Sequence, residues 1–256
     1  MHETTGPVIT RFDFSTDPDA SVRARLGLLV LESDQTMERE IREITDALGV
    51  SVYHARLANE TVVTSDSLAK MEAELPVAAS LLPEYLGLRA IGYGCTSGAT
   101  VIGEDRIEAI LRGTHPDIPS TNPLTAAKAA LKALGVERLG LLTPYTPEVT
   151  EAMQQRFGEA GIAITVVGSF YEENDIVVGQ IDPKSILKAA IALGKSDLCD
   201  GIFISCTSLR AAGIIKEAEV ELGKPVTASN HALAWHLLRL AGIDDKLADF
   251  GRLFSV

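Results

Sequence analysis

The sequence Cys-Thr-Ser occurs twice in this chain, at Cys95–Ser97 in GYGCTSGA and at Cys206–Ser208 in FISCTSLRA. Each triplet follows a short apolar run, a pattern that predicts a buried strand. A cysteine between a strand and a helix lies near free backbone N–H groups and the positive end of the helix, which lower its pKa and favour the thiolate. Hydroxyl and N–H groups beside it suit a carboxylate, so each triplet is predicted to be a nucleophile or a carboxylate-binding site.

Two such thiols on opposite sides of one ligand predict two-base chemistry. One thiolate would remove the proton next to a carboxylate, and the other thiol would return a proton to the opposite face, which inverts a stereocentre without a metal or cofactor. The same pair could instead act with one thiolate as a nucleophile on an activated double bond and the other thiol as an acid. A single cysteine after a strand is as often a small buried hydrophobe, so the repetition carries this inference.

Two other functions fit the same residues. Two facing α/β lobes also describe non-catalytic proteins that bind small carboxylates. Cys95 and Cys206 could also form a redox-active disulfide, although the chain has no Cys-x-x-Cys motif. The third cysteine, Cys199, has no counterpart in the first half, and both it and His231 are predicted to be structural.

The sequence consists of two similar halves of about 110 residues each. Similar segments recur in the same order: RLGLL at 25–29 and 138–142, ALGVSV at 47–52 and EAGIAI at 159–164, and TNPLTAAKAALKALGV at 121–136 and SNHALAWHLLRLAGI at 229–243. Because the spacing between partners is nearly constant, these matches and the two Cys-Thr-Ser triplets indicate an internal duplication.

Each half alternates short β-rich runs with amphipathic stretches, which predicts an α/β fold with parallel sheets. Helices are predicted at 36–49 and 207–225, each with a glycine near its end. Two small doubly wound domains facing each other fit this order, and so does a single eight-stranded βα barrel; both bind ligands at the carboxyl ends of strands. The predicted strands are 25–31, 50–55, 89–94, 118–121, 138–143, 162–168, 201–205 and 224–228.

Composition excludes several classes of partner. The hydrophobic fraction of 46% is enough for a sizeable core, and the formal net charge of −12 argues against nucleic acid and anionic membranes. Residues 1–22 are polar, lack the pattern of a signal peptide and predict a flexible N-terminal arm, so a cytoplasmic protein with free thiols is expected. No zinc-binding or phosphate-loop motif occurs, and no cofactor is expected.

The segments CTSGATVIG, LLTPYTPEV, ISCTSLRA and the terminal FGRLF make residues 24–256 resemble the aspartate/glutamate racemase superfamily. The resemblance is to the branch of maleate cis–trans isomerases, arylmalonate decarboxylases and the EutA proteins of ectoine utilisation. It implies two pseudo-twofold-related Rossmann-like domains, each a roughly four-stranded parallel sheet flanked by helices, with the active site in the cleft between them. The domains would be 23–121 plus 231–256 and 122–230, and a homodimer is expected.

The resemblance also implies a function and roles for single residues. The chain is expected to be a cofactor-independent isomerase of a small carboxylate or amino-acid-derived substrate, in ectoine or amino-acid catabolism. Cys95 would be the nucleophile or first base and Cys206 the second acid/base. Arylmalonate decarboxylases have glycine at the position of the first cysteine, so decarboxylation is the alternative, beside simple binding. Carboxylates would be held by Thr96, Ser97, Tyr145, Thr207 and Ser208.

Two further positions are expected to bind substrate. The isomerases have an asparagine where this chain has Asp34, in ESDQT. A carboxylate there would repel a second substrate carboxylate and would suit an amine- or amide-bearing group, or it would simply cap the following helix. Asn174, in YEENDIVVG, lies where the isomerases have a substrate-binding asparagine.

Overall fold

The computed structural model describes Pro7, residues 9–17 and residues 22–256. Much of the predicted N-terminal arm, residues 1–6, 8 and 18–21, lies outside the described residues. Residues 9–17 are exposed and contain no helix or strand. The flexibility of the arm therefore stays a prediction.

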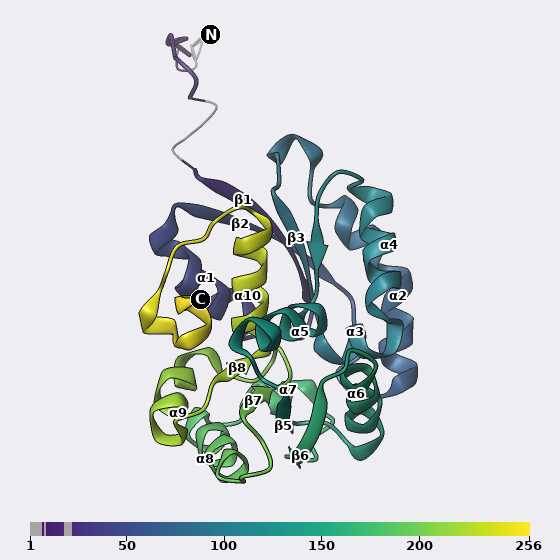
Figure 1. Cartoon of the computed structure of the whole chain (residues 1–256). Helices are drawn as coiled ribbons and strands as arrows, with labels where there is room; N and C mark the ends of the chain where they lie inside the picture. Colours follow the sequence, from purple (N-terminus) through teal and green to yellow (C-terminus); the bar gives the residue numbers. More distant parts are fainter. Residues whose placement is uncertain (1–6, 8, 18–21) are drawn as a thin grey trace.

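Two four-stranded parallel sheets form the framework, and both have the same strand order (Figure 1). The order is β2-β1-β3-β4 in the first sheet and β6-β5-β7-β8 in the second, which confirms the duplicated α/β fold and excludes the barrel. All eight predicted strands are present, with ends within two residues of the prediction. The strands are β1 Ala24–Leu31, β2 Val50–Leu57, β3 Ala90–Gly94, β4 Ser120–Thr121, β5 Arg138–Thr143, β6 Ala163–Ser169, β7 Gly201–Ile204 and β8 Val226–Ala228.

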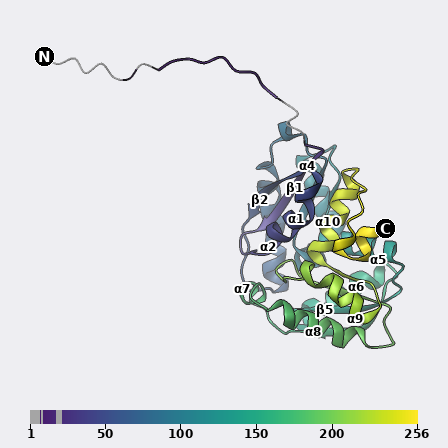
Figure 2. The same cartoon turned by 90° about the vertical axis from the view of Figure 1, so that its left-hand side faces the viewer.

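Helices cover both faces of each sheet. In the first half, α1 and α10 lie on one face and α2 and α4 on the other (Figure 1). Figure 2 shows α8 and α9 at the end of the molecule opposite β2 and α4. The helices are α1 Met37–Thr45, α2 Ser65–Ser80, α3 Thr96–Ile102, α4 Glu104–Thr114, α5 Pro123–Leu134, α6 Pro147–Glu159, α7 Asp175–Val178, α8 Pro183–Gly194, α9 Ile215–Leu222 and α10 Ser229–Leu240. Short 3-10 helices occur at Asp46–Leu48, Glu84–Leu86, Ala212–Ile214, Ala248–Phe250 and Arg252–Ser255.

One of the two predicted helices differs from the structure. The helix predicted over 36–49 is α1 followed by a 3-10 turn, and it ends at Gly49 with φ 66°. The helix predicted over 207–225 is wrong in its first part, because residues 207–211 are not helical and the first helical residue of this segment is Ala212. Residues 207–211 instead form a loop whose polar groups bond to the first half: the carbonyl of Ser208 accepts from Thr36 Oγ1 at 2.9 Å. Contacts between the halves outweigh the local helical pattern here.

The last helix joins the first half of the molecule. The apolar face of α10 packs with β1 and α1 in one hydrophobic cluster, to which Leu233 and Leu237 belong. Helix α5 divides its residues between the two cores: Ala126 and Ala130 belong to this cluster, and Leu131 belongs to the other. The domain boundaries given above stay a prediction. Among the described residues, no helix has the length and apolar character needed to cross a bilayer.

Candidate active site

The two sheets turn the carboxyl ends of their strands toward one small cavity. The strand order reverses direction between the neighbouring strands β1 and β3 in the first sheet and between β5 and β7 in the second. Open α/β sheets bind ligands at this position. The cavity has a volume of about 10 Å³, room for about one water molecule, so a carboxylate can enter only if surrounding side chains move. Its lining comes from both halves and includes Cys95, Thr96, Tyr145, Asp175, Cys206 and Thr207.

Cys95 lies between β3 and α3, as the sequence predicts. It is the N-cap residue of α3, and its Sγ accepts a hydrogen bond from the backbone N–H of Gly98 at 3.2 Å. A side chain at position 98 would collide with the Tyr93 hydroxyl, so glycine is required there. Burial raises the pKa of Cys95 to about 11, although the Ser97 hydroxyl and the Gly98 N–H lower it. The expected low pKa is therefore wrong for this closed arrangement, because desolvation outweighs the helix N-terminus.

Cys206 follows β7 but does not precede a helix. Its backbone has φ 111°, a conformation that residues other than glycine rarely adopt. Burial raises the pKa of its thiol, and the nearby Asp175 carboxylate raises it further, whereas Tyr145 and the Ser208 N–H lower it. The expected helix N-terminus is absent at this second thiol, and its pKa also moves opposite to the prediction.

Ser229, the first residue of α10, connects the two triplets. Its Oγ accepts a hydrogen bond from the backbone N–H of Cys206 at 2.9 Å. The same Oγ shares a hydrogen bond of 2.7 Å with Thr96 Oγ1. Ser229 is fully buried, so both bonds are shielded from water. One hydroxyl group therefore sets the position of both Cys-Thr-Ser elements relative to each other.

The hydroxyl groups of Ser97, Thr207 and Ser208 each contact a different group. Thr207 Oγ1 donates to the carbonyl of Gly94 at 3.3 Å, which is a second link between the halves. Ser97 lies 3.5 Å from the Cys95 sulfur. Ser208 is buried behind the cavity wall, where its Oγ donates to Asp175 Oδ1 at 2.7 Å. Thus Thr96, Ser97 and Thr207 line the cavity, and Ser208 holds a residue that does.

Tyr145 follows β5 and offers a free donor. Its side chain is 2% exposed, and its hydroxyl has no hydrogen-bond partner among the described residues. Burial holds its pKa well above 10, so the phenol stays protonated at neutral pH. A buried hydroxyl without a partner is rare in folded proteins and suits an acceptor that arrives with a ligand.

Asp34 follows β1 and has two different oxygens. Its Oδ1 accepts from the backbone N–H groups of Thr36, the N-cap residue of α1, and of Met37, both at 2.8 Å. Its Oδ2 is buried and has no hydrogen-bond partner among the described residues. Burial raises the pKa of Asp34 to about 6, and the Asp175 carboxylate adds to the increase. Asp34 therefore holds the start of α1 with one oxygen and keeps the other oxygen unused.

Asn174 lies outside the cavity lining, and its neighbour Asp175 takes part instead. The Oδ1 atom of Asn174 accepts from the N–H groups of Ile176 and Val177, which caps α7. Asp175 is 5% exposed, and its Oδ2 accepts from Ser33 Oγ at 2.5 Å. Asp175 was not among the residues predicted from the sequence; the available signal was a carboxylate directly before three apolar residues in a polar loop.

His231 and Cys199 are structural, as predicted. The two ring nitrogens of His231 bond to Thr227 Oγ1 at 2.9 Å and to the carbonyl of Phe250 at 2.6 Å. Burial lowers the pKa of His231 to about 4, so its ring is neutral at physiological pH. Cys199 is buried before β7, and its Sγ contacts the carbonyl of Ser196.

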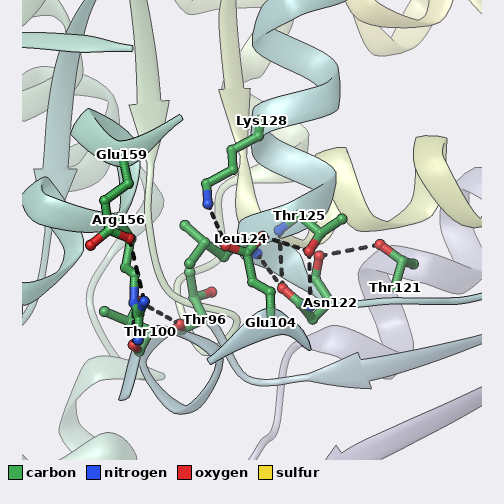
Figure 3. A network of polar contacts seen from close by, with 10 residues as sticks. All are labelled: Thr96, Thr100, Glu104, Thr121, Asn122, Leu124, Thr125, Lys128, Arg156 and Glu159. Atoms are coloured by element: carbon green, nitrogen blue, oxygen red, sulfur yellow. Dashed lines mark hydrogen bonds and ion pairs between the residues drawn. The ribbon is translucent and has the colours of Figure 1, made fainter. Parts of the chain in front are cut away.

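A polar network holds the far side of α3 in place (Figure 3). Thr100 Oγ1 donates to the carbonyl of Thr96 at 2.9 Å, and Arg156 Nε of α6 donates to the carbonyl of Thr100 at 3.1 Å. An ion pair between Glu104 and Lys128 joins α4 to α5. Because α6 belongs to the second half, these contacts hold the helix behind Cys95 from both halves.

Glu40 is a further buried acid, next to the loop that follows Cys206. Its Oε1 accepts from the Ala212 N–H at 2.9 Å, and its Oε2 accepts from Asn230 Nδ2 at 2.8 Å. Asn230 Nδ2 also donates to the carbonyl of Thr207 at 2.8 Å. Burial raises the pKa of Glu40 from 4.5 to about 7. The carboxyl group therefore supports the Cys206 loop and holds its proton more tightly when the chain is folded.

Glu40→Gln should change how stability depends on pH. Because the pKa of Glu40 is higher in the folded chain, wild type loses stability as the pH rises from about 4.5 through about 7, whereas the glutamine of the variant does not titrate. The unfolding free energy of wild type relative to Glu40→Gln should fall by about 3 kcal/mol over this range. Urea unfolding between pH 4.5 and about 7 measures this, with the exposed Glu43→Gln on the same helix as control. A pH-independent difference would contradict it.

Comparison with known proteins places the chain in a family. The profile of the arylmalonate decarboxylase (Amdase) family matches residues 85–254. The arylmalonate decarboxylase of Bordetella bronchiseptica is 32% identical over 140 residues, which span 54% of this chain and 58% of that protein. The maleate isomerase of Alcaligenes faecalis is 20% identical over 244 residues, which span 90% and 96%.

Solved structures agree with the fold. The maleate cis–trans isomerase of Nocardia farcinica, a cysteine-to-serine variant with a covalently bound succinylcysteine intermediate, has a TM-score of 0.84 at 23% identity, covering 91% of this chain and 98% of that one. The maleate isomerase of Pseudomonas putida S16 with maleate has a TM-score of 0.83 at 22% identity, covering 91% and 97%. The relatives support an isomerase- or decarboxylase-type enzyme for small carboxylates. Since the family profile matches most of its length, and the motifs and fold agree, this chain belongs to the arylmalonate decarboxylase family.

Proposed function

We propose that this chain is a cofactor-independent isomerase of a small carboxylate, in which Cys95 and Cys206 transfer protons on opposite faces of the substrate. The observation that carries the proposal is that two thiols, one from each half of a duplicated fold, line one cavity. The backbone N–H of Gly98 donates to the Cys95 sulfur at 3.2 Å, and the N–H of Ser208 lowers the pKa of Cys206. These donors stabilise whichever sulfur carries the negative charge.

The proton transfers balance within the pair. The Cys95 thiolate takes the proton from the carbon next to the carboxylate, and the electron pair of that C–H bond delocalises into the carboxylate. The Cys206 thiol then gives its proton to the opposite face, which leaves Cys95 protonated and Cys206 as the thiolate. The Tyr145 hydroxyl, which has no partner among the described residues, donates to the carboxylate as charge develops on it. The product is the mirror-image stereocentre.

Cis–trans isomerisation by the same pair is the other form of this function. Cys95 would add to a carbon of the double bond, the adduct would rotate about the resulting single bond, and elimination would restore the double bond in the other geometry. The succinylcysteine in the Nocardia farcinica enzyme is a cysteine adduct in that protein, and it supports this form. A role in ectoine or amino-acid catabolism and a homodimer remain predictions from the resemblance, and a cytoplasmic location remains a prediction from the sequence itself.

Decarboxylation is the second candidate. Its support is the family profile and the 32% identity to an arylmalonate decarboxylase. Loss of carbon dioxide leaves a carbanion that needs one proton donor, and a single thiol supplies it. Cys95 and Cys206 both line the cavity, so the chain has one thiol more than this reaction uses. We therefore rank it below isomerisation.

Proton NMR in D2O distinguishes these reactions. Purified protein under reductant would be incubated with maleate, phenylmalonate and a panel of single-enantiomer amino acids, with Cys206→Ala as control. Isomerisation predicts either loss of an α-proton signal with inversion or a growing fumarate signal, and neither with the variant. Monoacid formation from phenylmalonate alone, at a rate that depends on Cys206, would replace the proposal with decarboxylation. Conversion that is equally fast with Cys206→Ala would refute the two-thiol mechanism.

A further inference from the structure

Two buried tyrosines lie beside the two thiols. Tyr93 and Tyr145 are buried, whereas the other tyrosines of the chain are half-buried or exposed. Burial raises the pKa of both thiols, but the Tyr93 hydroxyl lowers that of Cys95 and the Tyr145 hydroxyl lowers that of Cys206. The proposed mechanism uses Tyr145 and leaves Tyr93 without a role.

The Tyr93 hydroxyl lies next to the Cys95 sulfur. Tyr93 belongs to β3, two residues before Cys95, and its side chain is fully buried. A methyl group at position 98 would overlap the Tyr93 hydroxyl and would lie 3.1 Å from the Cys95 sulfur. The hydroxyl and the sulfur therefore flank the same point beside Gly98. Cys95 lines the cavity and Tyr93 does not, so the hydroxyl can act on a ligand only through the thiol.

The Tyr93 hydroxyl has a poor acceptor in this closed arrangement. It donates to the thioether sulfur of Met71 at 3.9 Å, and a thioether is a weak acceptor. A buried phenol without a strong partner is unfavourable. A thiolate accepts a charge-assisted hydrogen bond, which is about twice as strong as a neutral one. Ionisation of Cys95 therefore offers the hydroxyl a better acceptor than Met71.

The phenol of Tyr93 keeps its proton when the thiol ionises. Burial holds the pKa of Tyr93 well above its usual value of 10, and Cys95 adds to the increase. Tyr93 therefore stays a donor at neutral pH and exchanges no proton with a substrate. The other titratable residues that line the cavity are Glu60, Tyr145, Asp175 and Cys206. Of these, the Asp175 carboxylate raises the pKa of Cys95, and Glu60 pairs with Lys70, so Tyr93 opposes Asp175 at the sulfur.

We propose that Tyr93 is a positioning residue for Cys95, whose hydroxyl turns from Met71 to the sulfur when that sulfur carries a negative charge. The inference rests on the proposed function, which it deepens by naming the group that supports the first base. The Tyr93 hydroxyl and the Gly98 N–H then hold the thiolate from two sides. No covalent bond forms or breaks at Tyr93.

Alkylation of the thiols tests this without a substrate. Wild type and Tyr93→Phe would be partly labelled with iodoacetamide at mildly alkaline pH, and mass spectrometry would give the rate at each cysteine. Losing one charge-assisted hydrogen bond raises the pKa of a thiol by about one unit, while a less acidic thiol is a better nucleophile. Labelling of Cys95 relative to Cys206 should therefore fall about 3- to 10-fold. An unchanged ratio would overturn the proposal.

Three internal and matched controls separate this effect from a structural one. Tyr145→Phe should move the ratio in the opposite direction, because the Tyr145 hydroxyl acts on Cys206. Cys199, buried away from the cavity, reports general opening of the fold. Tyr53→Phe, half-buried in β2, should leave the ratio unchanged. If Tyr93→Phe changes the labelling of all the cysteines by the same factor, its role is structural and the proposal is wrong.

Met71→Leu keeps the proposal testable if Tyr93→Phe fails to fold. Leucine has a similar volume but no sulfur, so the Tyr93 hydroxyl loses the acceptor that competes with Cys95. Labelling of Cys95 relative to Cys206 should then rise about 2-fold or more, the range of one neutral hydrogen bond. A ratio that falls or stays the same would contradict the assignment.

Turnover separates this inference from the proposed function. Tyr93→Phe should lower kcat about 10-fold with a smaller change in KM, the loss expected for one hydrogen bond to a charged group. Full turnover without Cys95 or Cys206 would refute the two-thiol mechanism and leave the labelling result as it is. An unchanged labelling ratio with the thiol requirement intact would instead remove the role of Tyr93 and leave the mechanism standing.

Discussion

Cys95→Ala and Cys206→Ala should each lower turnover by about 10³-fold or more while the protein stays folded. Each substitution removes one of the two thiols that transfer protons in the proposed mechanism, and the cavity lining contains no third cysteine among the described residues. The Cys95 sulfur accepts from the N–H of Gly98 and lies 3.5 Å from Ser97 Oγ, and alanine removes only this one buried atom. The double variant should be no worse than either single variant, because the two thiols act as a unit.

Steady-state kinetics and thermal unfolding of the variants measure both parts of this prediction. Cys199→Ala is the matched control: it removes a buried thiol whose sulfur contacts the carbonyls of Leu193 and Ser196, away from the cavity. This control should keep wild-type turnover. Full activity in Cys95→Ala or Cys206→Ala would show that one thiol is sufficient, and the two-thiol account would have to be abandoned.

Ser229→Ala should lower kcat by about 10²-fold with a smaller change in KM, and destabilise the fold by about 1–3 kcal/mol. The substitution leaves the N–H of Cys206 without its acceptor and removes the link to Thr96. Cys206 has φ 111°, so its backbone needs that restraint to hold the thiol in place. Ser229 is a positioning residue, because it acts on the reacting carbon through the thiols.

The split between kcat and KM separates positioning from a general loss of stability. Thr45→Ala is a suitable control, since Thr45 is equally buried and its hydroxyl bonds to the carbonyl of Ile41 in its own helix. It should lose stability with little change in the kcat of the folded fraction. If Ser229→Ala keeps wild-type kcat once corrected for folded protein, the bridge between the triplets has no catalytic role.

The parts of the fold that depend on local sequence were predictable. The strands follow from short apolar runs with turn residues between them, and the duplication repeats each run in the second half. Cys95 was placed correctly because a single local pattern, strand then helix, determines its surroundings. The two sheets have the same strand order because the two halves repeat the same pattern.

The parts of the structure that depend on contacts between distant segments were not predictable from the sequence. The loop after Cys206 has a helical pattern, but its groups bond to Thr36, Gly94 and Asn230 instead. Asp175 enters the cavity because Ser33 and Ser208, far away in sequence, donate to it. The thiol pKa values rise because the halves exclude water, an effect that no local motif reports.

The central claim is that two thiols act on opposite faces of one carbon, and deuterium labelling tests it most directly. A single enantiomer of the amino acid that inverts in the NMR panel would be followed in D2O at low conversion. The account predicts deuterium at the α-carbon of the product enantiomer, while the remaining starting enantiomer keeps its proton. The reason is that the donor thiol carries deuterium from solvent and the other thiol holds the proton just removed. Deuterium entering both enantiomers at equal rates would mean that one group serves both faces, and would contradict the claim.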